Sequence, residues 1–321
     1  MADVTVLGAG VAGLWAAFTL SRAGLSVRLI DRHGGPGPHG CSWWAGGMLA
    51  AFCEGAMAEP AVVAHGRAAA TAWATVTEVI ARGSLVVALA RDRGELERFA
   101  RRTGGHRQVT DLRALEPDLA GIRQALFFER EAHLDPRRAL ADLVAALGAR
   151  DVPVETAETT PEDIPGPVID TRGIGADLPG LRAVRGEMVV LRAPEIRLTR
   201  PLRLLHPRHP LYIVPRPDGQ YMLGATQIES ADRRGMTARS LMELLGAAYA
   251  LDPRFGEAEV LETGADLRPA FADNVPRVLV RGRVVHLNGL FRHGYLMAPA
   301  LARQAADWIT QGIKGDLVDV D

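Results

Sequence analysis

The start of the chain alternates between strand-like and helix-like patterns of apolar residues. A short apolar run at residues 4–7 precedes a glycine-rich turn, helical spacing follows at residues 11–22, and a second apolar run occupies residues 26–30. Short apolar runs bounded by turn residues are typical of buried strands, and longer helical periodicity is typical of a helix. The pattern therefore predicts a strand, a helix and a strand, with the two strands parallel and joined by a right-handed crossover.

The middle of the chain changes to closely spaced strands. Residues 184–226 carry several strand-like runs, two of which are separated by a Pro-Asp-Gly turn, and this predicts an antiparallel sheet. Helices are expected at residues 61–82, 95–102, 135–149, 237–251 and 296–311, and strands at 84–89, 167–169, 187–192, 211–214, 221–225, 259–263 and twice within 277–287. The fold class is therefore α/β. We expect a nucleotide-binding domain of residues 1–82, 130–180 and 268–321 and an interleaved antiparallel domain of residues 83–129 and 181–267.

The amino-acid composition and charge indicate which kinds of binding partner to expect. Hydrophobic residues make up 48% of the 321 residues and the formal net charge is -1, so neither nucleic acid nor a membrane surface is expected to bind. The chain shows no secretory leader and no apolar run of about 18 residues, so a cytoplasmic location is expected. Cys41, Cys53 and the histidines within residues 206–209 lack the spacing of a disulfide framework or a metal site. A small molecule is the expected partner, without a metal.

The first turn carries a dinucleotide-binding pattern. Gly8, Gly10 and Gly13 fit G-x-G-x-x-G between the predicted strand and helix, and the acidic Asp31, followed by Arg32, closes the second strand. Such glycines permit a tight turn, close approach of a pyrophosphate to the backbone, and close packing of helix on strand. The helix N-terminus would face the phosphates, and Asp31 would face the ribose. This motif leaves both NAD and FAD open.

Segments farther along the chain resemble one flavoenzyme family. They are Ser-Trp-Trp-Ala-Gly-Gly-Met-Leu at residues 42–49, Tyr-Ile-Val-Pro-Arg at 212–216, Gly-Ala-Thr at 224–226, Leu-Arg-Pro-Ala at 267–270 and Gly-Leu-Phe-Arg-His-Gly-Tyr-Leu-Met-Ala-Pro-Ala at 289–300. In this order they resemble the glycine oxidase and D-amino-acid oxidase family, and most closely its thiamine-biosynthetic glycine oxidases. The resemblance implies a Rossmann-type FAD-binding domain, an interleaved substrate domain and non-covalent FAD.

The resemblance also implies roles for individual residues. Arg292 and Tyr212 would hold a substrate carboxylate, and Arg268 would border the same pocket; a guanidinium can bind a carboxylate through two hydrogen bonds. The flavin would be contacted by Ser42, Gly47, Met48, Gly173, Arg268, Gly294, Tyr295 and Leu296. The amides at the start of the last helix would stabilise negative charge on the reduced flavin, so no side-chain base is required. His293 is interpreted as a packing or hydrogen-bonding residue, and a proton-transfer role stays open.

Three functions are compatible with these residues. The leading hypothesis is FAD-dependent oxidation of glycine or another small amino acid or amine, with an imine released and molecular oxygen reduced to hydrogen peroxide. The alternatives are a D-amino-acid or N-methyl-amino-acid dehydrogenase and a flavin-binding protein without turnover. Residues 152–167 are short and carry four prolines where the family has a longer meander. The adenosine is then either more exposed or covered by a neighbouring subunit, which leaves a homo-oligomer open.

Overall fold

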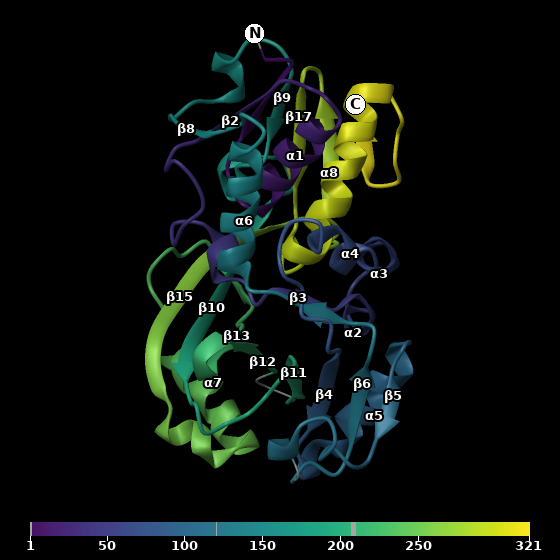
Figure 1. Ribbon diagram of the computed structural model, residues 1–321, viewed down its shortest axis with the longest axis vertical. Coiled ribbons are helices and arrows are strands. Elements are labelled where there is room, and N and C mark those ends of the chain that lie inside the picture. Colours follow the sequence, from purple (N-terminus) through teal and green to yellow (C-terminus); the bar gives the residue numbers. More distant parts are fainter. Residues whose placement is uncertain (1, 120, 207–209) are drawn as a thin grey trace.

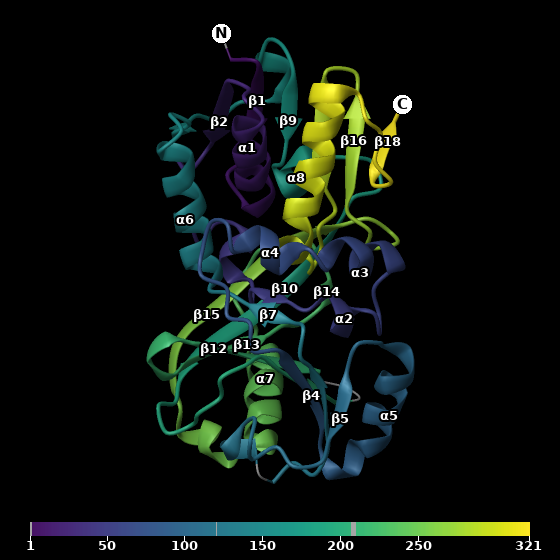
Figure 2. The same cartoon turned by 45° about the vertical axis from the view of Figure 1, so that its right-hand side comes forward.

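The computed structural model places the strands in two large sheets at opposite ends of an elongated molecule (Figure 1). It describes residues 2–119, 121–206 and 210–321, so part of the histidine-bearing segment 206–209 lies outside the described residues. Both termini lie at the end of the molecule that holds the first sheet (Figure 2). No helix in the described ranges is long and apolar enough to cross a membrane.

The first sheet has seven strands in the order β18-β16-β17-β9-β1-β2-β8. Their bounds are β1 Val4–Leu7, β2 Val27–Asp31, β8 Val154–Thr156, β9 Val168–Asp170, β16 Arg277–Arg281, β17 Val284–Asn288 and β18 Val318–Val320. Strands β1 and β2 pair in parallel, as predicted, and only β16 and β17 are antiparallel neighbours. Helices α1 (Val11–Arg22), α6 (Pro136–Gly148) and α8 (Gly294–Gln311) pack beside one another over this sheet and share its apolar core (Figure 2).

The second sheet has nine strands and is mainly antiparallel. The path is β14-β10-β13-β12-β11-β4-β6-β5, with β15 on β10. Their bounds are β4 Ser84–Ala88, β5 Arg107–Val109, β6 Ala125–Phe128, β10 Arg182–Arg192, β11 Leu202–Leu205, β12 Leu211–Arg216, β13 Gln220–Gly224, β14 Ile228–Glu229 and β15 Glu259–Ala270. Helix α7 (Ala238–Leu251) packs on β10, β12 and β13, and α5 (Arg93–Arg102) packs on β4 and β6. The antiparallel sheet predicted from the middle of the chain is therefore present.

The predicted helix over residues 61–82 is wrong. The segment forms two short helices, α3 (Pro60–Gly66) and α4 (Ala69–Trp73), and then a loop that pairs Ile80 with His133. Contacts with α8 explain the break. A Cβ atom on Gly66 would lie 2.7 Å from Cγ of Leu296, and the buried indole of Trp73 donates a 2.7 Å hydrogen bond to the carbonyl of Tyr295. Packing on α8 therefore overrides the helical propensity of the alanines.

Other elements differ in length or were not predicted. Strand β15 extends to Ala270, well beyond the expected 259–263, because it pairs with the whole of β10. Helix α8 begins at Gly294, two residues before the expected start. The sequence did not predict β5, β6, β8, β11, β14, β18, the short helix α2 (Ala51–Glu54), or the small hairpin of β3 (Met48–Leu49) with β7 (Ala132–His133). The proposed division of the residues into two domains stays a prediction.

Candidate functional site

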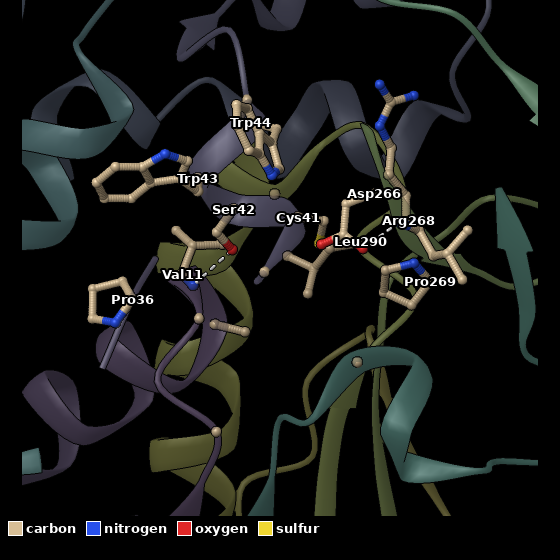
Figure 3. A pocket seen from close by; sticks show the side chains of 18 of the residues that line it. Val11, Pro36, Cys41, Ser42, Trp43, Trp44, Asp266, Arg268, Pro269 and Leu290 are labelled. Atoms are coloured by element: carbon tan, nitrogen blue, oxygen red, sulfur yellow. Dashed lines mark hydrogen bonds between the residues drawn. The ribbon is translucent and has the colours of Figure 1, made fainter. Parts of the chain in front are cut away.

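One cavity of about 530 Å³ lies where the two sheets meet. Its wall includes the start of α1 and the loop that carries Ser42 (Figure 3). The turn after β1, the start of α8 and residues of β10, β12 and β13 also line it. The predicted site residues that line it are Gly8, Gly10, Asp31, Arg32, Ser42, Gly47, Met48, Gly173, Tyr212, Arg268, Arg292, Gly294, Tyr295 and Leu296. The structure therefore brings these residues together from segments far apart in the sequence. Gly13 lies behind the wall.

The turn after β1 has the close packing that its glycines predict. Gly8 has a φ of +97°, a conformation that side chains rarely adopt, and Thr171 Oγ1 donates a 2.9 Å hydrogen bond to its carbonyl. A Cβ atom on Gly13 would lie 1.8 Å from that same carbonyl oxygen. Gly13 therefore lets α1 approach the turn, while Gly8 and Gly10 face the cavity.

The start of α1 presents backbone donors to the cavity. Gly10 is the N-cap and supplies no side-chain acceptor, and the amide of Val11 donates to Ser42 Oγ at 3.1 Å (Figure 3). Asp31, at the end of β2, accepts the amide of Ala9 at 2.9 Å through Oδ2 and the amide of His33 at 2.8 Å through Oδ1. A helix N-terminus with free amides binds anions such as phosphate. This end of the cavity therefore suits the phosphates and ribose of a nucleotide.

Neighbouring groups complete the nucleotide end. Arg32 donates from Nε to His33 Nε2 at 3.0 Å. Gly173 follows β9 with a φ of +59°, and its carbonyl accepts a 2.9 Å hydrogen bond from the buried side chain of Asn288. Gly173 therefore lines the same cavity as the turn after β1, and its contact with the cofactor stays a prediction.

The start of α8 forms the next part of the wall. His293 is the N-cap and its side chain does not cap the first amides of the helix, and the residues that carry these amides, Gly294, Tyr295 and Leu296, line the cavity. Tyr295 is buried, and its hydroxyl donates toward the carbonyls of Ser42 (3.0 Å) and Pro136 (3.1 Å). Gly47 has a φ of +75° and passes so close to Leu134 that a Cβ atom would lie 2.2 Å from its carbonyl oxygen. The loop beside the cavity is therefore fixed at both ends.

Arg268, on β15, is a cation that lines this part of the cavity. Its Nη1 donates to the carbonyl of Thr226 at 3.2 Å, and within the described ranges it forms no ion pair. The guanidinium lies over the backbone of Gly186, where a Cβ atom would be only 2.0 Å from Nη2. Burial lowers the pKa of Arg268, although an arginine remains charged. An anion in the cavity could therefore pair with Arg268 directly.

Arg292 is held by a glutamate that the sequence analysis did not identify. Arg292 Nη2 forms a very short contact with Glu54 Oε2, and each side chain is 11% exposed. Burial acts to raise the pKa of Glu54, but Arg292 and Arg203 more than offset it, so the pKa lies below its ordinary value. Glu54 is the only acidic residue among residues 32–58, which is the one sequence signal that could have marked it.

Two further side chains border this ion pair. His293 Nδ1 lies 3.8 Å from Glu54 Oε2, and burial lowers the pKa of His293 to about 4, so the imidazole is neutral near pH 7. Arg203 lies behind the wall with Nη1 3.7 Å from Glu54 Oε1, and its guanidinium stacks on the ring of Tyr212 at 5.2 Å. Arg203 belongs to β11, a strand that the sequence pattern did not predict.

The cavity as a whole fits a dinucleotide that carries a redox-active ring. The N-terminus of α1 lies at one end, and the N-terminus of α8 lies beside the cations and Tyr212 at the other. Met188, Val214 and Met222 form an apolar wall there. No group of three His, Cys, Asp or Glu residues suited to a metal ion occurs among the described residues.

Comparisons with known proteins agree with this geometry. The family model described as "FAD dependent oxidoreductase", DAO, matches residues 3–308. The putative thiamine biosynthesis oxidoreductase ThiO of Rhizobium etli is 53% identical over 94% of this chain and 95% of its own length. Glycine oxidase of Geobacillus kaustophilus is 26% identical over 96% of this chain and 92% of its own. The crystal structure of glycine oxidase from Geobacillus kaustophilus superposes with a TM-score of 0.82 and 22% identity, covering 99% of this chain and 96% of that chain.

These matches confirm the expected fold, the expected family and its FAD cofactor. The family match spans both sheets and nearly the whole chain. The chain belongs to the DAO family of FAD-dependent oxidoreductases.

Proposed function

We propose that this chain oxidises glycine, or another small amino acid or amine, and releases an imine that serves thiazole formation in thiamine synthesis. The observation that carries the proposal is Arg268, which lines the cavity with Tyr212 and forms no ion pair with any described residue. The name of the 53% identical relative supports the pathway, and the names of the glycine oxidases support the substrate. Molecular oxygen as the acceptor, a cytoplasmic location and a homo-oligomer stay predictions.

Arg268 and Tyr212 are the better carboxylate ligands. The family resemblance implies this role for Arg292 with Tyr212, but Arg292 is already paired with Glu54. A carboxylate bound to Arg292 would have to displace a buried anion, whereas one bound to Arg268 displaces only a backbone carbonyl. The Tyr212 hydroxyl can donate a second hydrogen bond to the same carboxylate. We therefore assign the substrate carboxylate to Arg268.

The other residues of the cavity favour hydride removal from a bound amino acid. FAD, when bound, supplies a ring that accepts the hydride. The first amides of α8 stabilise negative charge at that end of the cavity, and the methionines of β10 and β13 exclude water from it. The substrate amine loses its proton to solvent before it binds, so no side-chain base is assigned.

Anaerobic titration of the purified flavoprotein with glycine, sarcosine and D-alanine tests this function. We expect glycine or sarcosine to bleach the flavin absorbance, and oxygen to restore it with release of hydrogen peroxide. Bleaching that only an artificial acceptor reverses would identify a dehydrogenase. A flavin that none of these amines bleaches would contradict the proposed function and favour a flavin-binding protein without turnover.

Substitution of Arg268 tests the carboxylate assignment. Arg268→Met removes a charge-assisted bidentate contact, so we expect KM for glycine to rise on the order of 100-fold. The flavin spectrum and the thermal midpoint of the holoenzyme report whether the variant remains folded and loaded. A KM within about threefold of wild type would exclude Arg268 as the carboxylate ligand.

A further inference from the structure

We propose that Glu54 restricts this site to amino acids with a single carboxylate, because it holds Arg292 in an ion pair and so withholds that guanidinium from a second anionic group. The proposal rests on the proposed function of the same cavity and deepens it. It concerns the class of substrate that is rejected: amino acids or amines that carry two carboxylates, or a carboxylate and a phosphonate.

Two of the arginines that line the cavity, Arg268 and Arg292, have different partners. Arg268, on β15, lies across the cavity from Val11 and Ser42 (Figure 3) and donates only to a backbone carbonyl within the described part of the chain. Arg292, in the turn before α8, also lines the cavity but is paired with Glu54. Of these two guanidinium groups, only Arg268 is available to a ligand carboxylate, and a second carboxylate would have to compete with Glu54 for Arg292.

Displacing Glu54 from Arg292 is costly. Glu54 is 9% exposed, and the pKa of its carboxyl lies below the ordinary value, so it is an anion near pH 7. If a second substrate carboxylate took its place, Glu54 would keep only the more distant Arg203 and would face another anion. A buried carboxylate that loses its nearest partner is strongly destabilised, and like charges at close range repel.

Arg292 itself is ready to bind an anion once Glu54 releases it. Its Nε is buried and has no hydrogen-bond partner among the described residues, and Nη2 is occupied by Glu54 alone. Two adjacent guanidinium donors form the edge that binds a carboxylate in a bidentate manner. With a neutral side chain at position 54, the Arg292 guanidinium would therefore be free to bind a second anionic group.

The test is the dicarboxylate selectivity of the Glu54→Gln holoenzyme. Dissociation constants for acetate, malonate and succinate are measured by isothermal titration calorimetry with FAD bound, and the constant for each dicarboxylate is divided by the constant for acetate. In Glu54→Gln we expect this ratio to fall at least about tenfold for malonate or succinate, which means tighter relative binding. In the double variant Glu54→Gln with Arg292→Met we expect this gain to be lost. Ratios that stay within about twofold of wild type for both dicarboxylates overturn the proposal.

A matched control variant tests whether any loss of a buried or paired glutamate changes the ratios, and a further variant replaces Glu54→Gln if that variant does not retain FAD. Glu155→Gln neutralises another arginine-paired glutamate, which lies outside the cavity on Arg28, and should leave the ratios unchanged. If Glu54→Gln does not retain FAD, the double variant Glu54→Gln with Arg292→Met decides, because it removes the whole ion pair and leaves no unpaired carboxylate. Since Arg292 is withheld in the wild type, loss of the pair should change the malonate and succinate ratios less than about threefold. A tenfold loss confined to dicarboxylates would show that Arg292 already binds them, and would overturn the proposal.

These outcomes are distinct from failure of the proposed function. The ratios measure anion binding and need no turnover. If the flavin of the wild type is not bleached by glycine, sarcosine or D-alanine, the proposed function fails. The ratios of dissociation constants still test the role of Glu54 in that case.

Discussion

At the scale of single residues, Gly186 provides the space in which the Arg268 guanidinium lies. A Cβ atom there would be 2.0 Å from Nη2 and 2.2 Å from Cζ of Arg268. Gly186→Ala should therefore push the guanidinium away from its place, and we expect KM for glycine to rise roughly 10- to 100-fold. The displaced atoms are the end of a flexible side chain, so the thermal midpoint should change little. Steady-state kinetics that match wild type would contradict this arrangement.

Glu131 is a second residue with a testable role, in the pH dependence of stability. It is 1% exposed and accepts hydrogen bonds from the Ser84 hydroxyl and, at 2.6 Å, from the amide of Cys53. Burial is the main cause that raises its pKa from 4.5 to about 7. Between these pH values the folded state holds a proton that the unfolded state releases, so the contribution to stability is full below 4.5 and is lost as the pH rises through 7.

Glu131→Gln should remove this pH dependence. Urea unfolding of both proteins at pH 5 and pH 8 gives the difference in unfolding free energy at each pH. We expect wild type to lose stability relative to the variant by roughly 3 kcal/mol between these pH values. Parallel pH profiles of the two proteins would mean that Glu131 titrates at an ordinary pKa.

Residues with a local signature could be predicted from the sequence, and residues defined by distant contacts could not. Gly8, Gly10 and Asp31 stand at fixed spacing around one turn, so the motif alone placed them beside one cavity. Glu54 is significant only because Arg292, far along the chain, reaches it. Its own neighbours are apolar, and no short-range pattern reveals that partner. Arg203 could not be predicted for the same reason, because its contacts with Glu54 and Tyr212 arise from tertiary packing.

At the scale of elements, two helical glycines should respond in opposite ways to the same substitution. Gly13 in α1 has no room for a Cβ atom, because the carbonyl oxygen of Gly8 would lie 1.8 Å away. Gly246 in α7 is exposed and has open space at that position. Gly13→Ala should destabilise the protein by roughly 2 kcal/mol or more and reduce its FAD content. Gly246→Ala should stabilise it by about 0.5–1 kcal/mol, since alanine is the better helix former.

Urea unfolding and the flavin-to-protein absorbance ratio measure both variants. Because the substitution is identical, Gly246→Ala controls for the effect of an added methyl group on helix propensity. Equal stabilisation by both substitutions would show that α1 does not pack on the turn as closely as described.

Elements whose periodicity agrees with their packing could be predicted, and the others could not. Helix α1 and strands β1 and β2 combine strong apolar patterns with the glycine turn, and they form as expected. The alanines of residues 61–82 favour a helix locally, yet the contacts of Gly66 and Trp73 with α8 divide the segment. Strand β15 is long because β10 is long, and that pairing joins residues distant in the sequence.

At the scale of the whole molecule, the cavity lies between the two largest apolar cores. One core lies under α1, α6 and α8 on the first sheet, and the other lies between the second sheet and α7. FAD would contact residues of both parts, from Gly8 at the nucleotide end to Tyr212 at the substrate end, whereas ADP would reach only the nucleotide end. A ligand stabilises the parts of the folded protein that it contacts.

Differential scanning calorimetry of the protein stripped of flavin should therefore separate FAD from ADP. At about 100 times its dissociation constant, either ligand stabilises the state that it binds by about 2.7 kcal/mol. We expect ADP to raise only the unfolding transition of the first sheet, and FAD to raise both transitions and bring them together. The second sheet gains only through groups that the flavin ring reaches, such as Tyr212 and Arg268. A single transition that moves equally with both ligands at matched saturation would contradict this, because it would mean that the two cores already unfold as one unit without FAD.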